Sequence, residues 1–414
     1  MSFAKAAVAL QLLLCSVVSA LPTGEAQRDV AASGMTLYDA IIVGGGPSGL
    51  SALSGLGRVR RNVLLIDSGE YRNDPTRHMH DVIGFDGVTP AWYRWAAREQ
   101  LSHYETVASI NGTVTKIEAA ANTTSAEIPF TVRATFLSGQ EAILGARSIV
   151  LATGLRDILP STPGVQENWG KGIFWCPWCD GHEHEDQPLG ILSDLTEAAS
   201  SVQEISTLNS DIICFVNGSD TPAVREATEK KFPGWQKYLE AKGVRVENRT
   251  ISNITRLADG GAVHGDPSLP TFPEHDLFSV AFVEGGPSVQ RAAFYASFKN
   301  TQHSGIGAEM GVKLYGGRLA ADSARGLMTN IQNVYAIGDA NSDNVTNVPH
   351  ALFSGKRAAV FLHVQLARQE TAALLAAGNG TALAERDFNL DPRAVWEEMN
   401  GGKDDILDAS RFEQ

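Results

Sequence analysis

The stretch YDAIIVGGGPSGLSALSGLGRVRRNVLLIDSGE, residues 38–70, constrains the fold of this chain more than any other part of its sequence. A short apolar run at 40–43 leads into Gly44, Gly46 and Gly49, which have the spacing G-x-G-x-x-G. Residues of helical character follow to about Gly57, and a second apolar run at 63–66 ends at Asp67. The pattern predicts a strand, a glycine turn, a helix and a second strand, the unit that binds a dinucleotide in an α/β sheet.

Each part of this unit has a physical role. The glycines allow a tight turn and let backbone N–H groups approach a pyrophosphate, and the helix N-terminus adds a favourable dipole. Asp67 stands near the spacing expected for an acid that binds a ribose hydroxyl. A glycine-rich turn without a ligand is the alternative, but the strand, helix and acid together favour a dinucleotide site.

The N-terminus has the features of a secretory signal peptide over residues 1–20. Lys5 precedes an apolar run at 6–14, and small residues at 18–20 suit a signal peptidase. The run is too short to span a bilayer, although a retained N-terminal anchor is the alternative. Sequons N-x-S/T, which predict N-glycosylation, start at Asn111, Asn122, Asn217, Asn248, Asn253, Asn344 and Asn379. We expect a secreted, N-glycosylated protein.

Charge and cysteine content further limit the kinds of partner and chemistry that this chain can have. The net charge is −13 and there is no long basic run, which argues against a nucleic-acid or anionic-membrane partner. Of four cysteines, Cys15 lies in the predicted signal peptide. Cys214 lies in the apolar run 212–216 and is expected to be a buried small hydrophobic residue. The remaining pair, Cys176 and Cys179, forms a C-x-x-C motif.

Redox exchange is the interpretation of this motif that we favour. The spacing lets two sulfurs reach bonding distance across one turn, and a helix N-terminus, which Pro177 suits, lowers a thiol pKa. A structural disulfide is a weaker alternative, because so short a loop restrains little chain. Zinc is another alternative, with the candidate ligands Cys176, Cys179, His182 and His184, but H-x-H directly after C-x-x-C is a cramped spacing.

Taken in order, the motifs resemble those of the low-molecular-weight thioredoxin reductase family. The dinucleotide fingerprint is followed by the strand and A-T-G turn of SIVLATG (148–154), by C-x-x-C-D-G, and by the strand and G-D of NVYAIGDAN (333–341). The similarity covers about residues 38–368. Within this fold, segments 71–87 and 337–359 are most similar to fungal flavoprotein thiol oxidases, which include secreted sulfhydryl oxidases and dithiol oxidases of disulfide-bridged natural products.

The resemblance implies an α/β fold with two Rossmann-like domains. A discontinuous FAD-binding domain would comprise residues 37–160 and 296–368, and a degenerate NADPH-like domain, 161–295, would be inserted and carry the C-x-x-C. Residues 21–36 would form a flexible lead and 369–414 a C-terminal tail. A homodimer is expected on the same basis.

The resemblance also implies FAD as the cofactor and assigns roles to individual residues. Cys179 would face the flavin and Cys176 would exchange with the substrate. Asp180 would move a proton, with His182 or His184 as other candidates. His350, after Pro349 at the start of the last helix, would add positive potential beside the flavin or act as a base, unless it is a structural residue. The implied FAD-binding residues are Gly44, Gly46, Pro47, Ser48, Gly49, Asp67, Ser68, Arg72, His80, Val114, Thr153, Gly154, Asp339, Pro349 and His350; a structural role is the alternative for His78 and His80. No metal is predicted.

A second dinucleotide fingerprint, which a reductase needs for NADPH, is missing. In PLGILSDLTEAASSV, residues 188–202, Gly190 is followed by Ile191, Leu192, Ser193 and Asp194, so the turn lacks glycines. Asp194 would also place a negative charge where a phosphate should bind. The other candidate, FVEGGPSVQRAAF at 282–294, is interpreted as a turn. NADPH binding is therefore not expected.

These observations predict a secreted FAD-dependent thiol oxidase. Substrate thiols, on a small molecule or a peptide, would reduce the Cys176–Cys179 disulfide, and the electrons would pass through FAD to O₂ to give hydrogen peroxide. The first alternative is a dithiol oxidase that closes a disulfide in a small secondary metabolite. The others are an NADPH-dependent disulfide reductase and a non-catalytic flavin-binding protein.

Overall fold

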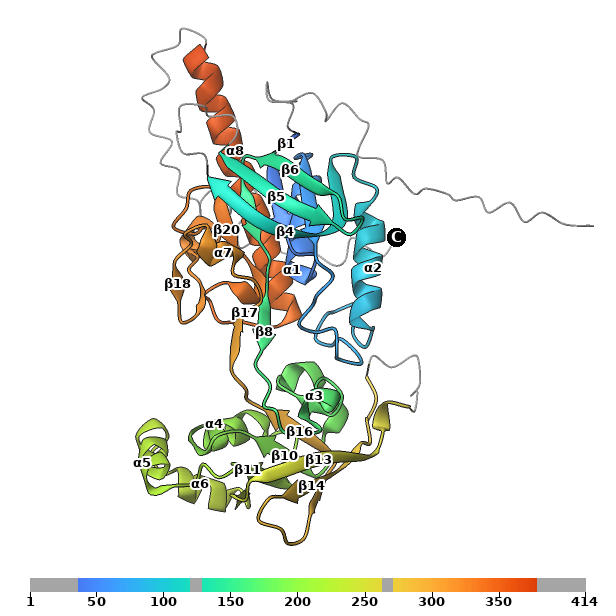
Figure 1. Cartoon of the computed structure of the whole chain (residues 1–414), viewed down its shortest axis with the longest axis vertical. Helices are drawn as coiled ribbons and strands as arrows, with labels where there is room; N and C mark the ends of the chain where they lie inside the picture. Colours follow the sequence, from blue (N-terminus) through green and yellow to red (C-terminus); the bar gives the residue numbers. More distant parts are fainter. Residues whose placement is uncertain (1–35, 120–128, 263–270, 378–414) are drawn as a thin grey trace, which may run out of the picture.

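The computed structural model describes residues 36–119, 129–262 and 271–377. The predicted signal peptide, the lead up to residue 35, the sequons at Asn122 and Asn379 and the tail beyond residue 377 lie outside the described residues. The described chain forms two lobes that are joined by two extended segments (Figure 1). The prediction of an α/β fold with two Rossmann-like domains is confirmed.

The larger lobe, called the FAD lobe here after the cofactor that the resemblance implies, contains an eight-stranded sheet of order β1-β6-β5-β4-β3-β2-β7-β20. Its strands are apolar and almost completely buried at the centre, as expected for parallel strands that are covered on both faces. Their bounds are β1 Leu37–Tyr38, β2 Ala40–Val43, β3 Val63–Asp67, β4 Val107–Ala119, β5 Phe130–Phe136, β6 Glu141–Ala146, β7 Ile149–Leu151 and β20 Val334–Ala336.

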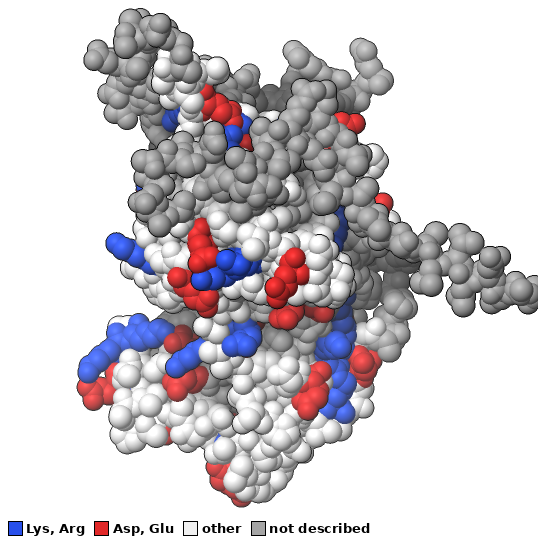
Figure 2. All heavy atoms as spheres, turned by 45° about the horizontal axis from the view of Figure 1, so that its top comes forward, with Lys and Arg blue, Asp and Glu red and all other residues white. Residues whose placement is uncertain are grey.

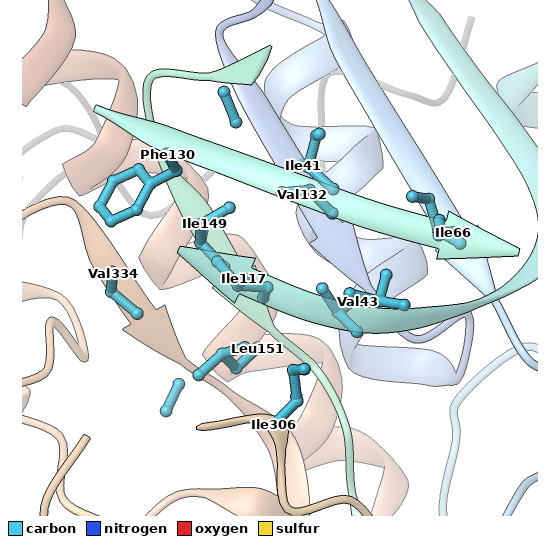
Figure 3. Close-up of a cluster of buried hydrophobic side chains, with 14 of the residues drawn as sticks. Ile41, Val43, Ile66, Ile117, Phe130, Val132, Ile149, Leu151, Ile306 and Val334 are labelled. Atoms are coloured by element: carbon cyan, nitrogen blue, oxygen red, sulfur yellow. The ribbon is translucent and has the colours of Figure 1, made fainter. Parts of the chain in front are cut away.

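Strand β4 links the two halves of this sheet. It pairs in parallel with β3 and antiparallel with β5, with a register shift between Val114 and Lys116. Side chains from the parallel half, including Ile41 and Ile149, share one core with Val132 and Phe130 of β5 (Figure 3). The antiparallel half therefore covers one face of the parallel half.

Helices cover the other face. α1 (Pro47–Gly57) and α8 (Val348–Ala377) pack on each other and on the sheet, with Leu53 and Leu362 buried between them. α8 continues past residue 368, the predicted start of the tail, and Glu370 on it pairs with Arg61. Short elements complete the lobe: α2 Pro90–Leu101, α7 Ile306–Glu309, β18 Leu314–Tyr315 and β19 Arg318–Leu319.

The inserted lobe has a five-stranded parallel sheet of order β12-β11-β10-β16-β9 and a three-stranded antiparallel sheet of order β13-β14-β15. A core of aromatic residues, among them Phe215, Phe278 and Phe294, lies between the two sheets, and α4 and α6 cover the opposite face. The elements are β9 Ile173–Phe174, β10 Leu189–Leu192, β11 Ile212–Phe215, β12 Arg245–Glu247, β13 Ile251–Ala258, β14 Leu277–Phe282, β15 Val289–Arg291, β16 Ala293–Ala296, α3 Val165–Asn168, α4 Leu195–Ile205, α5 Pro222–Lys231 and α6 Trp235–Ala241.

Two segments connect the lobes, β8 (Leu155–Asp157) and β17 (Asn300–Gln302), which pair antiparallel (Figure 1). On the face shown in Figure 2, Lys and Arg side chains are interspersed with Asp and Glu side chains. Within the described residues, no helix combines the length and apolar character needed to cross a membrane.

Candidate active site

A cavity of about 340 Å³ opens where the glycine turn meets the inserted lobe. The turn between β2 and α1 forms one wall. Gly44 has a φ of 109°, and a Cβ there would lie 2.4 Å from the carbonyl oxygen of Ala152, so only glycine fits. Gly46 precedes α1 with no side chain capping the helix, and nothing lies within 4 Å of the place where its Cβ would be. The N-terminus of α1 is therefore open to a ligand.

Most of the predicted site residues line this cavity. Those that do are Gly44, Gly46, Pro47, Ser48, Asp67, Ser68, Arg72, His80, Val114, Thr153, Gly154, Cys179, Asp180 and Asp339. Those that do not are Gly49, Cys176, His182, Pro349 and His350. Gly49 lies behind the turn, where a Cβ would meet the carbonyl oxygen of Gly44.

Asp67 is 1% exposed and is already engaged by the chain. Its Oδ1 accepts from the backbone N–H of Gly69 at 3.1 Å, and its Oδ2 accepts from Tyr71 Oη at 2.6 Å and from Arg98. Burial and the bond to Asp67 raise the pKa of Tyr71 to about 12, so the phenol stays a donor. The carboxylate is thus held rigidly at the cavity wall.

Asp339 and Asp157 are joined by Arg72. Arg72 donates from Nη1 to Asp339 at 2.9 Å and from Nη2 to Asp157 at 2.7 Å. Its guanidinium also lies 5.5 Å from the ring centroid of Trp175. Burial raises the pKa of Asp339, and the Arg72 charge opposes that rise. Arg72 thereby ties the end of β20 to the connecting strand β8.

Cys176 and Cys179 form a disulfide bond. The segment Pro177–Gly181 is a single π-helical turn, and the N–H groups of Cys179 and Asp180 donate to the carbonyl of Cys176 at 3.1 and 3.2 Å. This turn brings Cys179 to the cavity that the glycine turn lines, whereas Cys176 lies outside the lining. Trp178, next to the disulfide, is 71% exposed.

Asp180 is a candidate proton carrier at this disulfide. Burial, followed by repulsion from Glu183 and Glu274, raises its pKa well above the usual range, and Arg77 only partly opposes this. Its Oδ2 is buried with no hydrogen-bond partner among the described residues. A carboxyl group in this setting holds its proton where an ordinary aspartate is ionised.

His80 contacts the redox turn directly. Its Nδ1 lies 2.7 Å from the carbonyl oxygen of Cys179, and because a carbonyl only accepts, Nδ1 carries a hydrogen and donates. Its Nε2 lies 3.3 Å from Glu183 Oε1. Glu183 was not predicted from the sequence; the signal would have been its position three residues after Asp180 in the C-x-x-C-D-G segment.

The zinc alternative is wrong for this arrangement. The two sulfurs bond to each other, and the histidines point to different partners. His182 is exposed and pairs with Glu185 at 3.0 Å, while buried His184 donates from Nδ1 to the carbonyl of Glu274 at 3.1 Å. Burial lowers the pKa of His184, which keeps the ring neutral.

Two predicted catalytic histidines lie away from the cavity. His182 takes part only in the surface pair with Glu185. His350 follows the start of α8, but its Nε2 lies 2.7 Å from Asp343 Oδ2, and Asn347 and Ala351 line the cavity instead. A direct catalytic role for these two histidines is therefore not supported by their placement. Cys214, in contrast, is fully buried as predicted.

The helix that corresponds to α1 in the inserted lobe is α4, and its N-terminus is closed. The N–H of Leu195 donates to Ser219 Oγ at 2.9 Å, and the N–H of Thr196 donates to Asp194 Oδ1 at 3.0 Å. A cavity of about 220 Å³ lies in front of this helix. Among the residues that the structure describes, Asp194 is the one charged residue that lines it, and no Lys or Arg lines it to neutralise phosphates.

The cavity at α1 fits FAD. It offers an uncapped helix N-terminus for a pyrophosphate, acidic side chains at Asp67 and Asp339 for hydroxyl groups, and the Oγ1 of Thr153, which is buried and unpartnered among the described residues. The cavity at α4 offers no free helix N-terminus to a pyrophosphate, since the first N–H groups of α4 are already bonded.

Comparison with known proteins agrees with this geometry. Residues 38–259 match the pyridine nucleotide-disulphide oxidoreductase family. A probable thioredoxin reductase of Arthroderma benhamiae is 45% identical over 357 residues, which cover 85% of this chain and 86% of that protein. The thioredoxin reductase tcpT of Claviceps purpurea is 28% identical over 337 residues, 80% of this chain and 94% of that protein.

Solved structures show the same fold. HlmI superimposes with a TM-score of 0.67 at 27% identity, over 82% of this chain and 96% of that one. An oxidoreductase from Agrobacterium tumefaciens gives a TM-score of 0.64 at 26% identity, over 81% and 99%. With the family match, the relatives and the two cavities taken together, this chain belongs to the pyridine nucleotide-disulphide oxidoreductases as a thioredoxin-reductase-like flavoprotein that binds FAD.

Proposed function

We propose that this chain oxidises a dithiol to a disulfide with FAD as cofactor and O₂ as the final electron acceptor. The observation that carries the proposal is the difference between the two helix N-termini. That of α1 opens into the cavity that Cys179 also lines, whereas that of α4 is capped by Asp194 and Ser219. Because the described residues form a flavin site and leave no free helix N-terminus for a second dinucleotide at α4, thiols are the electron source that we favour.

The chemistry begins at the disulfide. A substrate thiolate attacks the Sγ of Cys176, the S–S bond breaks, and Cys179 leaves as the thiolate. The second substrate thiol then attacks the substrate sulfur in the mixed disulfide, which releases the product disulfide and the Cys176 thiol. The substrate loses two electrons and two protons. FAD, when bound, accepts this electron pair from the reduced cysteines and passes it to O₂, which takes up two protons to become hydrogen peroxide.

The neighbouring residues supply positions for the protons. Asp180 lines the same cavity as Cys179, and its raised pKa keeps a proton beside the leaving sulfur. His80 fixes the Cys179 carbonyl through Nδ1 and holds the redox turn in place. Neither role requires His182 or His350.

A dithiol substrate fits this site better than two separate thiols. Cys176 is only partly exposed, so a second, free thiol would have to reach a sulfur that is already covered by the first. When both thiols belong to one molecule, the second arrives at a high effective concentration. A small-molecule dithiol is the substrate class that we favour, and peptide dithiols are the alternative.

The decisive experiment is an anaerobic titration of the purified holoprotein. A suitable dithiol should abolish the visible flavin absorbance, and air should restore it with about one hydrogen peroxide per disulfide formed. A panel from glutathione through peptide dithiols to small dithiols distinguishes the substrate classes. Rapid loss of the absorbance with NADPH, and no oxygen uptake with any thiol, would overturn the proposal in favour of a reductase.

A further inference from the structure

Arg77 makes ion pairs across the boundary between the two lobes. It belongs to the FAD lobe, in the segment between β3 and α2, and its carboxylate partners belong to the inserted lobe. It donates from Nη1 to Asp276 Oδ2 at 2.9 Å, from the same nitrogen to Glu274, and from Nη2 to Asp259 at 2.6 Å. The side chains are 12% exposed for Arg77, 7% for Glu274 and 0% for Asp276.

The same segment reaches the redox turn. His78 Nδ1 lies 3.6 Å from Glu274 Oε1, and His80 bridges Glu183 and the Cys179 carbonyl. In Figure 1 the chain that leads into β14 lies beside the loop that precedes α2. One short segment of the FAD lobe therefore contacts both the acidic residues before β14 and the disulfide.

Backbone packing supports the same contact independently. A Cβ at Gly170, in the inserted lobe, would lie 2.8 Å from the backbone of Pro75 and Thr76. A Cβ at Gly261 would lie 2.2 Å from the Arg77 Nε. The two lobes thus approach each other so closely at Arg77 that the inserted lobe has glycine at both points of contact.

This contact is needed because the covalent connection is slender. Only β8 and β17 join the lobes within the described chain, and lobes connected in this way are expected to move relative to each other unless a buried interface holds them. Without Arg77, Asp276 would keep its pair with Arg256, but Glu274 would lose its guanidinium partner in a low-dielectric site that it shares with Asp180 and Glu183. Because separation of the lobes would expose these carboxylates to water, loss of Arg77 would favour it.

We propose that Arg77 is a positioning residue that docks the inserted lobe on the FAD lobe and keeps Cys179 in the flavin cavity throughout turnover. The inference rests on the proposed function in one respect, the exchange of electrons between Cys179 and the flavin.

The test uses the holoprotein with Cys176→Ser, in which a free Cys179 thiolate beside FAD gives long-wavelength charge-transfer absorbance. Arg77→Ala in this background should reduce the absorbance at least fivefold at unchanged FAD content. Arg77→Lys should retain at least half of it, because an ammonium group still reaches one carboxylate. Arg291→Ala is the matched control, since Arg291 is a buried arginine that pairs with Asp211 inside the inserted lobe.

The rates of two half-reactions distinguish a loss of docking from general damage to the protein. In the chain with both cysteines, Arg77→Ala should slow anaerobic flavin reduction by dithiothreitol at least tenfold. Reoxidation by O₂ after chemical reduction, which takes place within the FAD lobe, should proceed at the parent rate. Equal absorbance and equal reduction rates in Arg77→Ala and Arg291→Ala would overturn the proposal.

A third measurement keeps docking distinct from the redox function. Small-angle X-ray scattering of the holoprotein should give a larger radius of gyration for Arg77→Ala than for the parent and the Arg291 control. If the Cys176→Ser parent lacks the absorbance but Arg77→Ala still expands, docking is supported and the role of Cys179 fails. If Arg77→Ala does not fold, Arg77→Gln, which removes the charge but keeps most of the side chain, replaces it, and unchanged absorbance in that variant overturns the proposal.

Discussion

The carboxylate of Asp194 accepts a hydrogen bond from the backbone N–H of Thr196 at 3.0 Å and so closes the N-terminus of α4. The corresponding position before α1 is Gly46, which caps nothing. A helix N-terminus can bind a pyrophosphate only while its N–H groups are free. The same supersecondary unit therefore serves as a nucleotide site in one lobe and as a self-contained structural element in the other.

Replacement of Asp194 should cost stability without creating a nucleotide site. Asp194→Ala removes an N-cap and should lower the free energy of unfolding by about 1 kcal/mol. The exposed pair of Glu226 with Lys230 provides a control, since Glu226→Ala should cost no more than about 0.5 kcal/mol. Urea denaturation measures both.

NADPH should leave the flavin spectrum unchanged under anaerobic conditions, in the parent and in Asp194→Gly alike. The glycine would free one N–H group, but Ser219 still occupies another, and within the described part of the chain no Lys or Arg lines the cavity. Reduction of the flavin by NADPH in Asp194→Gly alone would show that the cap is the sole obstacle.

The first βαβ unit could be predicted from the sequence to within a residue. Its strand, helix and second strand lie at Ala40–Val43, Pro47–Gly57 and Val63–Asp67, close to the predicted bounds. The pattern is local: the apolar runs, the glycine spacing and Pro47 each determine the backbone within a few residues. The absence of a second glycine turn before α4 could be read from the sequence for the same reason. The sequence alone indicates only that Asp194 there is a charge that repels phosphate, whereas in the structure it also caps the helix.

The acidic cluster around the redox turn could not be predicted in this way. Arg77 and Glu274 are 197 positions apart, and only the packing of the two lobes brings them together. Asp180 was predicted through the resemblance, but the burial that raises its pKa depends on Glu183, Glu274 and the lobe contact. His350 illustrates the opposite case: its place near the start of α8 was predicted, but the sequence did not indicate that its side chain would turn to Asp343.

The two cysteines should behave unequally. Cys179→Ser should abolish flavin reduction by dithiols, because Cys179 is the sulfur that lines the cavity. Cys176→Ser should leave a thiolate at Cys179 and give the charge-transfer absorbance. Absorbance spectroscopy of the two variants distinguishes the two cysteines. If the charge-transfer band appeared in Cys179→Ser instead, the roles assigned to Cys176 and Cys179 would be reversed.

Asp180→Asn should lower activity and raise stability. The folded-state pKa of Asp180 lies above its unfolded value, so the native state binds more protons between these values and loses stability as the pH rises through them. Asparagine removes this penalty, so the melting temperature of the variant should exceed that of the parent at pH 7 and approach it at pH 3. Dithiol oxidation should fall about 100-fold through the loss of a proton carrier. Unchanged kcat and pH profile would exclude this role.

Thiol counts should report on the predicted export. Burial raises the pKa of Cys214 to about 12, so the native, oxidised protein should not react with a thiol reagent. After denaturation without reductant, a secreted chain that has lost Cys15 with its signal peptide should expose one thiol, and a retained N-terminus would give two. Removal of N-glycans should also lower the mass; no change in mass would argue against glycosylation.

Acid should weaken the interface between the lobes through Glu274. Burial alone would raise the pKa of this carboxyl, but the nearby His78 ring and the charge of Arg77 outweigh it and lower the pKa from 4.5 to about 2. A depressed folded-state pKa gives stability that is complete above about pH 4.5 and is lost as the pH falls from there towards 2. The shift corresponds to a contribution on the order of 3 kcal/mol.

Glu274→Gln should therefore be less stable than the parent at pH 7 by an amount on the order of 3 kcal/mol, and the difference should shrink steadily below pH 4.5. Urea denaturation over a pH series measures it, with the exposed Glu240→Gln as a control that should follow the parent at every pH. A difference between parent and Glu274→Gln that stays constant from pH 7 to pH 2.5 would show that the glutamate contributes by packing and not through its charge. The ion pairs of Arg77 would then rest on Asp276 and Asp259 alone.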